Sequence, residues 1–150
     1  MSEAGLLVVA ILLCLLGNGF FSGSEIAVLS VRRSRIEALI AEGSKAAQRV
    51  KALQDDMDTF LATVQIGVTL MGTLAGVLGG YLASRHVERL LEGTAFAGWV
   101  LPSVVAGSLV GRGNVYVELI IGELAPKPLA QRFSETVALL VSWPLQTLAQ

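Results

Sequence analysis

Residues 4–21 read AGLLVVAILLCLLGNGFF, a run of eighteen positions without a charged side chain. A transmembrane helix needs about 20 mostly apolar residues, so this run is long enough to form most of one. Two further uncharged stretches follow at 60–84 and 94–111. We expect three spans, at about 4–29, 60–84 and 96–124. The sequence therefore predicts an all-α membrane protein, with one transmembrane domain over all 150 residues.

The composition excludes several classes of protein. Of the 150 residues, 53% are AVILMFWYC and only 15% are charged, against about 25% charged in ordinary soluble domains. The mean hydropathy is +0.67, and the formal net charge of −1 provides no basic field for nucleic acid. Cys14, the single cysteine, has no partner for an internal disulfide and is typical of a small buried hydrophobic residue. We expect neither an enzyme nor a nucleic-acid-binding protein.

The basic residues indicate how the chain is oriented in the membrane. Loops rich in Lys and Arg stay in the cytoplasm. We therefore expect the N-terminus outside, the C-terminus in the cytoplasm, and a multi-pass protein in the plasma (inner) membrane. Six of the eleven basic side chains lie between the first two predicted spans, namely Arg32, Arg33, Arg35, Lys45, Arg49 and Lys51.

Two segments outside the spans are predicted to be helical and to lie along the membrane surface. Residues 31–57 carry apolar side chains near helical spacing, interrupted at Gly43 and Ser44, which is typical of a helical hairpin. The basic side chains of this cytoplasmic hairpin would face anionic headgroups. Residues 128–149 include a 14-residue apolar stretch with Pro144. That stretch is short for a span, so we expect a C-terminal interfacial helix there.

The second predicted span carries a ridge of glycines. Gly72, Gly76 and Gly80 recur every four residues, which lets two helix backbones approach closely in lipid. We expect this helix to pack tightly on another span or on a second copy of the chain. The alternative is that these glycines only reflect the abundance of glycine in membrane helices.

Three carboxylates, those of Glu25, Glu118 and Glu123, fall in or beside the predicted spans. A carboxylate at the bilayer centre costs about 2.5–3.5 kcal/mol, so it rarely lies there without a task. Asn18, Ser22 and Glu25 are four and three residues apart and share one helix face. Alternatively, Glu25 and Glu123 lie near the inner interface, where they cap helices or pair with basic side chains. The candidate partners are then Arg32, Arg35 and Lys127.

Glu118 and Glu123 are separated by five residues. On a regular α-helix this spacing places them about 140° apart. One π-type widening near Gly122 would bring the two carboxylates closer to a common face.

The polar groups at membrane depth are all oxygen donors, without a thiol or a usable imidazole. Carboxylates, hydroxyls, amides and bare carbonyls suit Mg²⁺ or Ca²⁺, or Na⁺ in a weaker site, and disfavour zinc, copper and iron. Glycine-interrupted helices with polar groups near the midplane are typical of ion sites in transporters. The residues therefore predict a site for a hard cation.

Three motifs together resemble those of one family of membrane proteins. They are FFSGSEIA at 20–27, QIGVT at 65–69 and GELAPK at 122–127. In this combination, and over nearly its whole length, the chain is similar to the transmembrane domain of the CorC/CorB family, bacterial and archaeal relatives of the cyclin M (CNNM) proteins. The resemblance implies a dimeric Mg²⁺ transporter that exports Mg²⁺ in exchange for Na⁺. It also implies three spans per protomer and a belt of juxtamembrane helices on the cytoplasmic side.

The resemblance also implies which residues lie at or near the ion site. Matching positions place Ser22 and its neighbours, Gly67, Thr69 and Glu123 there, and spacing adds Asn114 and Glu118. Glu25 either touches the ion or braces Arg32 or Arg35. The full set expected at the metal is Ser22, Glu25, Gly67, Thr69, Asn114, Glu118 and Glu123.

Two features depart from the family pattern. Family members normally continue into cytoplasmic CBS modules that bind adenine nucleotide. Because this sequence stops at Gln150, we expect it to lack those modules and nucleotide regulation. In addition, GRGN at 111–114 stands where an apolar stretch is expected in the third span.

Two other functions are compatible with the same sequence. One is a channel for the same cation, whose flux would not follow a sodium gradient. The other is a membrane anchor that presents cytoplasmic domains and transports nothing.

Overall fold

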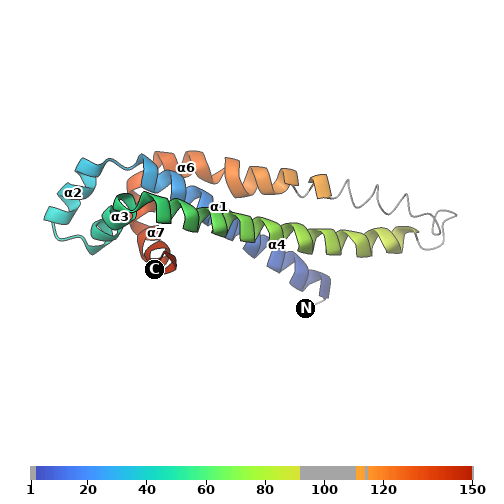
Figure 1. Ribbon diagram of the computed structural model, residues 1–150. Helices are drawn as coiled ribbons and strands as arrows, with labels where there is room; N and C mark the ends of the chain where they lie inside the picture. Colours follow the sequence, from blue (N-terminus) through green and yellow to red (C-terminus); the bar gives the residue numbers. More distant parts are fainter. Residues whose placement is uncertain (1–2, 92–110, 114, 150) are drawn as a thin grey trace.

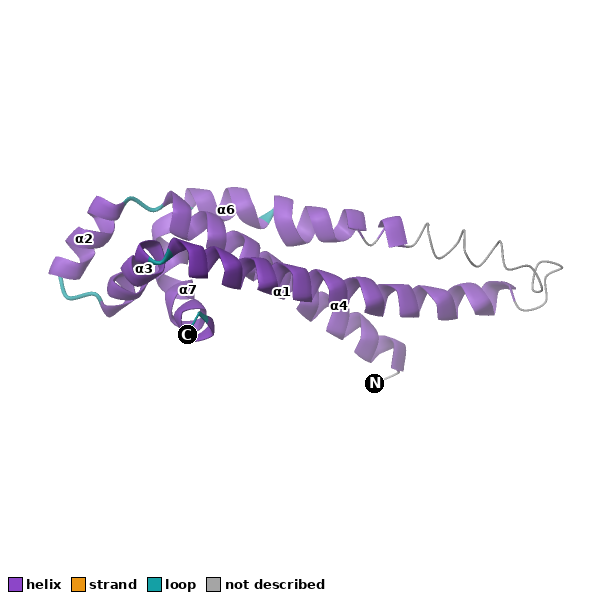
Figure 2. Ribbon diagram, in the orientation of Figure 1, coloured by secondary structure: helices purple, strands orange, loops and turns teal. Residues whose placement is uncertain are grey.

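The computed structural model describes residues 3–91, 111–113 and 115–149, with the backbone alone for 86–91, and every element in these ranges is a helix (Figures 1 and 2). The predicted all-α class is confirmed. The elements are α1 (Glu3–Ser30), α2 (Arg33–Ala41), α3 (Lys45–Asp55), α4 (Met57–Leu91), the π-helix η1 (Glu118–Leu124), α6 (Pro126–Arg132) and α7 (Ser134–Leu148).

Helices α1 and α4 pack along each other and form the long body of the molecule (Figure 1). Both are long and apolar enough to cross a membrane, since the 28 residues of α1 extend about 42 Å at 1.5 Å per residue. Apolar side chains on α1 point outward, and Leu13 and Leu16 are 63% and 66% exposed. An exposed apolar surface of this length is suited to lipid.

The third predicted span, 96–124, lies largely outside the described residues. Its described part is helical at 111–113 and 115–117 and continues into η1. Helix η1 and the following α6 pack against α1.

A tight turn separates α2 from α3. The backbone N–H of Gly43 donates to the Ile40 carbonyl and that of Ser44 to the Leu39 carbonyl, at 2.9 and 3.0 Å. Gly43 has φ +89°, a left-handed conformation that favours glycine at this position after a helix. The Ser44 hydroxyl then accepts a hydrogen bond from the Ala47 N–H and caps α3. The Gly-Ser pair thus ends one helix and starts the next.

The main hydrophobic core lies where α1 ends and α4 begins. Side chains from six helices meet there, and the largest fully buried apolar ones are Val28, Ile36, Val50, Phe60, Val64 and Leu145. Helix α7 packs against both α3 and α1 at this end (Figure 1). The core therefore holds one end of the α1–α4 pair in place.

The single helix expected over 128–149 is instead two helices, α6 and α7. Phe133 lies between them with φ −114° and ψ 37°, outside helical geometry. Its N–H donates to the Leu129 carbonyl and its carbonyl accepts from the Val137 N–H. Because α6 follows α1 while α7 packs against α3, one straight helix could not make both contacts.

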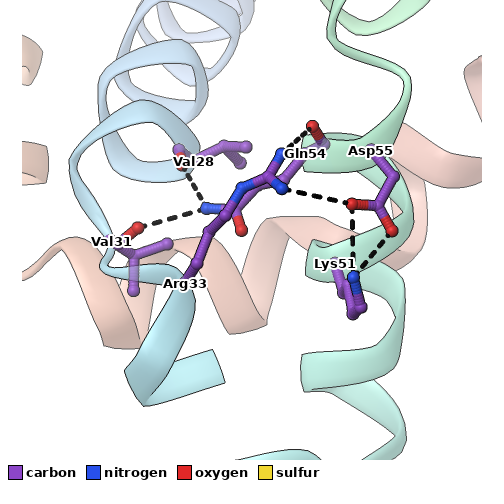
Figure 3. A network of polar contacts seen from close by, with 6 residues as sticks. All are labelled: Val28, Val31, Arg33, Lys51, Gln54 and Asp55. Atoms are coloured by element: carbon purple, nitrogen blue, oxygen red, sulfur yellow. Dashed lines mark hydrogen bonds and ion pairs between the residues drawn. The ribbon is translucent and has the colours of Figure 1, made fainter. Parts of the chain in front are cut away.

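A buried glutamine closes the end of α1 (Figure 3). Gln54 of α3 is 6% exposed, and its side-chain amide donates to the carbonyls of Val28 and Val31 at 3.0 and 3.1 Å. The last carbonyls of a helix have no partner within the helix, so this amide satisfies two of them. Arg33 donates to the Gln54 backbone carbonyl at 2.9 Å and lies 3.7 Å from the Asp55 carboxylate.

Replacing Gln54 tests this contact. Gln54→Ala leaves two buried carbonyls without partners and should lower the free energy of unfolding by about 1–3 kcal/mol. Gln48→Ala is the matched control, because Gln48 is exposed on the same helix. Chemical denaturation in detergent measures both variants. Equal stability of the two would contradict a structural role for the Gln54 amide.

An exposed ion pair joins α2 to α7. The Arg35 guanidinium donates hydrogen bonds of 2.9 and 3.1 Å to the two Glu135 carboxylate oxygens. These hydrogen bonds, helped by the opposite charges, lower the pKa of Glu135 and raise the pKa of Arg35. A hydrogen bond from Lys51 lowers the pKa of Asp55 in the same way. The carboxylates of Glu135 and Asp55 therefore stabilise the folded state most when they are ionised.

Lowering the pH should reduce the stability of the fold, because Glu135 becomes protonated. Its pKa is lower in the folded chain, so its stabilising effect is present above the ordinary carboxyl pKa of about 4.3 and is lost as the pH falls through the lowered value. Thermal unfolding followed from about pH 6 to about pH 3 should show a smaller loss of stability for Glu135→Gln than for the wild type. Glu37→Gln, which removes an exposed carboxylate of α2, should behave as the wild type does. An unchanged acid profile in Glu135→Gln would contradict this assignment.

Candidate functional site

Three polar side chains of α1 are buried, although the helix is apolar over most of its length. Asn18, Ser22 and Ser24 are 1%, 2% and 0% exposed. The Ser24 hydroxyl donates to the Phe20 carbonyl of its own helix, as serine in a membrane helix commonly does. In the described structure, the Asn18 Oδ1 and Ser22 Oγ atoms have no hydrogen-bond partner. A buried polar atom without a partner destabilises the fold by about 1–3 kcal/mol. A ligand bound to these two oxygens would remove that cost.

Glu118 brings a carboxylate to the same place from η1. Its Oε1 lies 3.5 Å from the Asn18 Nδ2, and it fills the space where a Cβ on Gly72 of α4 would be. Gly122 faces Asn18 just as closely, because an added Cβ would lie 2.6 Å from the Asn18 Nδ2. The carboxylate thus occupies the junction of α1, α4 and η1.

The π-helical segment sets the relative positions of the two glutamates on η1. The Ala125 N–H donates to the Ile120 carbonyl, five residues earlier, at 2.9 Å. In this register residues i and i+5 lie nearly above one another, which brings Glu118 and Glu123 toward one face. The structure has the π-type widening that would bring the two carboxylates toward one face, in the π-helix at Glu118–Leu124.

Pro126 follows the π-helix directly and begins α6. Proline has no N–H and donates no hydrogen bond to the carbonyls one turn before it. The carbonyls of Ile121 and Gly122 are directed toward Gly19 of α1, where an added Cβ would lie 3.6 and 3.9 Å from them. These two backbone oxygens therefore lie close to α1 at Gly19.

The other two candidate carboxylates have different surroundings. Glu123 lies 3.8 Å from Lys127 on the next turn, as the alternative interpretation of this residue expected. Glu25 is half-buried, and within the described ranges it makes no ion pair. Arg35 pairs with Glu135 instead of Glu25. The proposed bracing of Glu25 by Arg35 is therefore not seen.

The motif of α4 contributes one of its two predicted residues to the interior. Gly67 is buried against the Phe21 ring, and an added Cβ would lie 2.6 Å from three of its carbon atoms. Thr69 is exposed and borders a hollow on the outer face of α4. Two residues correspond to about 200° of helical turn, so Gly67 and Thr69 cannot face the same side. Thr69 therefore lies on the side of α4 opposite to Gly67, and its place at the ion site stays a prediction.

Asn114, the remaining candidate, lies outside the described residues. Within the described part of the chain, no group of three or more His, Cys, Asp and Glu side chains could hold a metal ion. A cation here would therefore depend on at most the two η1 carboxylates, together with hydroxyl, amide and carbonyl oxygens. Such a donor set suits a hard cation.

Sequence reasoning missed the direct contact between Asn18 and Glu118, and the role of Gly72 in making room for it. The four-residue spacing of Asn18 and Ser22 was the one indication of this contact, because it places the two side chains on the same face of the helix. Nothing in the sequence indicated that Gly72 lies opposite Glu118.

The buried oxygens between long apolar helices define a helical membrane protein with a polar site among its helices. The family model described as "Cyclin M transmembrane N-terminal domain" matches residues 9–150. The chain belongs to this family, and the resemblance drawn from the three motifs is confirmed.

Curated relatives are similar over most of this chain. UPF0053 protein sll0260 of Synechocystis is 35% identical over 137 residues, which cover 89% of this chain and 30% of that protein. UPF0053 protein YhdP of Bacillus subtilis is 35% identical over 97% of this chain and 32% of its own length. UPF0053 inner membrane protein YfjD of Escherichia coli is 31% identical over 87% of this chain and 28% of its length. The chain spans about a third of the length of these relatives.

Glycine-to-alanine substitutions on α4 should distinguish a closely packed glycine from one on an open surface. Gly67→Ala forces the Phe21 ring to move, and overpacking of this kind should lower the free energy of unfolding by about 1–3 kcal/mol. Gly76→Ala is the matched control, because no described atom outside its own helix backbone lies within 4 Å of its added Cβ, and its effect should stay within about 0.5 kcal/mol. Chemical denaturation in detergent compares the two. Equal stability of both variants would contradict the Gly67–Phe21 contact.

Proposed function

We propose that this chain forms the transmembrane part of a Mg²⁺ transporter that exports Mg²⁺ in exchange for Na⁺ entry. The observation that carries the proposal is the buried Ser22 Oγ of α1, which has no hydrogen-bond partner in the described structure. Ser22 lies on the helix that packs against both α4 and η1. Membership in the cyclin M transmembrane family supports this assignment.

The chemistry of the donors favours Mg²⁺ over softer metals. Ser22 offers a hydroxyl, Glu123 a carboxylate, and the η1 segment adds backbone carbonyls next to Pro126. Mg²⁺ prefers an octahedron of oxygen ligands and commonly keeps some of its water, so a few protein oxygens and one or two carboxylates are sufficient. Glu118 adds negative charge to the same junction, which favours any cation.

The arrangement in the membrane follows from the charges. The six basic residues of 31–57 support a cytoplasmic position for α2 and α3 and an external N-terminus. We place three spans in the plasma membrane, with α6 and α7 on the cytoplasmic side. The cation site then opens to the cytoplasm through an acidic cavity, and rearrangement of the third span releases the ion outside.

A homodimer would complete the outer face of α4. Gln65, Thr69 and Thr73 follow one another along this face and line a surface hollow. Polar side chains in a membrane need partners, so a second copy of the chain is suited to this face.

Transport by liposomes containing the purified chain and a Mg²⁺-sensitive dye tests the function. The wild type should move Mg²⁺ at a rate that follows an imposed Na⁺ gradient. Ser22→Ala and Glu123→Gln should each reduce the flux at least about tenfold, because a loss of 1.4 kcal/mol in ion binding already corresponds to that factor. Ser24→Ala is the matched control, since Ser24 bonds only to its own helix, and it should retain the flux.

The other outcomes separate the alternatives. Flux that ignores the Na⁺ gradient indicates a channel, and flux no greater than that of empty liposomes indicates a membrane anchor. A Ser22→Ala variant as active as Ser24→Ala would remove Ser22 from the ion site.

A further inference from the structure

Glu118 and the groups around it lie at a different level along α1 from Ser22, farther from the cytoplasmic end of the helix. Its carboxylate meets Asn18 of α1 at 3.5 Å and fills the space left by Gly72 of α4. Asn18 is four residues before Ser22, which places it about 6 Å farther from the cytoplasmic end of α1. Glu118 is likewise one π-turn before Glu123. The polar groups therefore form two levels along α1 and η1.

The Asn18–Glu118 level lacks the partners that a half-buried carboxylate and a buried amide require. The 3.5 Å separation is at the outer limit of a hydrogen bond, and Asn18 Oδ1 has no partner although the residue is 1% exposed. No basic side chain of the described ranges pairs with Glu118. In contrast, Glu123 on the other level has Lys127 at 3.8 Å.

We propose that Asn18 and Glu118 form a second cation subsite, separate from the Ser22–Glu123 level, and that it binds Na⁺. The inference rests on the proposed function, because it assigns a place to the ion that exchanges with Mg²⁺. Gly72 supplies the room that the carboxylate needs, and the Asn18 amide supplies a neutral oxygen when it is turned over. The amide orientation exchanges two nearly equivalent atoms, so either can face Glu118.

The charge of this level suits a monovalent ion. Glu118 brings one carboxylate and the Asn18 amide beside it is neutral, so a single positive charge balances the pair.

The distance of about 6 Å between the two levels also explains why Na⁺ and Mg²⁺ would exchange for each other. A monovalent and a divalent cation at this separation repel each other strongly in a medium of low dielectric constant. Binding of Na⁺ beside Glu118 therefore weakens Mg²⁺ binding beside Ser22, and the reverse holds by linkage.

Thermal unfolding of the purified chain in detergent tests the subsite. The unfolding temperature is measured in NaCl and in choline chloride of equal ionic strength, each with and without MgCl₂. For the wild type, saturating NaCl should raise it by about 2–4 °C or more over choline chloride. Glu118→Gln should abolish this shift and retain the shift caused by Mg²⁺. Glu123→Gln should do the opposite.

A second variant keeps the test decisive if Glu118→Gln does not fold. Gly72→Ala displaces only the flexible end of the Glu118 side chain, so it should fold and still lose the Na⁺ shift. Gly76→Ala, one turn away with open space around it, should keep the shift.

Three results would overturn the subsite: no Na⁺ shift in the wild type, an undiminished Na⁺ shift in Glu118→Gln or Gly72→Ala, or loss of both shifts in Glu118→Gln. The last result would place Glu118 in one shared site. If the wild type shows a Na⁺ shift that depends on Glu118 but no Mg²⁺ shift, the subsite stands and the proposed Mg²⁺ function fails.

Discussion

A polar atom inside a membrane protein must have a partner within the protein or in a bound ligand, because lipid offers none. Most of α1 meets this condition through its own helix, and Ser24 does so by donating to the Phe20 carbonyl. Asn18 and Ser22 do not, although both are almost fully buried. The same helix packs against α4, η1, α6 and α7, so its unsatisfied oxygens belong to the helix at the centre of the described packing. Cations bound beside them would satisfy them and would balance the carboxylates of η1.

Close packing around these oxygens depends on glycines. Gly72 admits the Glu118 carboxylate, and Gly122 admits the Asn18 amide. The π-helix then brings Glu118 and Glu123 toward one face, and Pro126 returns the chain to α-helical geometry in α6. The helical pair of α2 and α3 lies at the end of α1, where Gln54 satisfies its last carbonyls. One end of the molecule is thus fixed by a hydrophobic core, whereas the site lies among the helices beyond it.

The parts of this arrangement that depend on local sequence could be predicted. The apolar runs indicated α1 and α4, and the motifs identified the family. The five-residue spacing showed only that Glu118 and Glu123 would need a local widening of the helix to share a face. Features that depend on tertiary packing could not be predicted in this way. The turn at Phe133 lets α7 pack against α3 as well as α1, whereas α6 packs against α1 and η1. The outward orientation of Thr69 follows from the side of α4 that meets α1 at Gly67, which one sequence does not reveal. The contact of Gly72 with Glu118 joins two segments distant in the chain.

The central claim is that a divalent cation binds beside Ser22 and the carboxylates of η1. Crystals of the purified chain grown with Mn²⁺, which shares the oxygen-ligand preference of Mg²⁺, would show the metal directly by its anomalous scattering. The account predicts a peak bonded to the Ser22 hydroxyl and to a carboxylate oxygen of η1. Peaks confined to exposed carboxylates such as Asp55, with no metal in contact with Ser22, would contradict it.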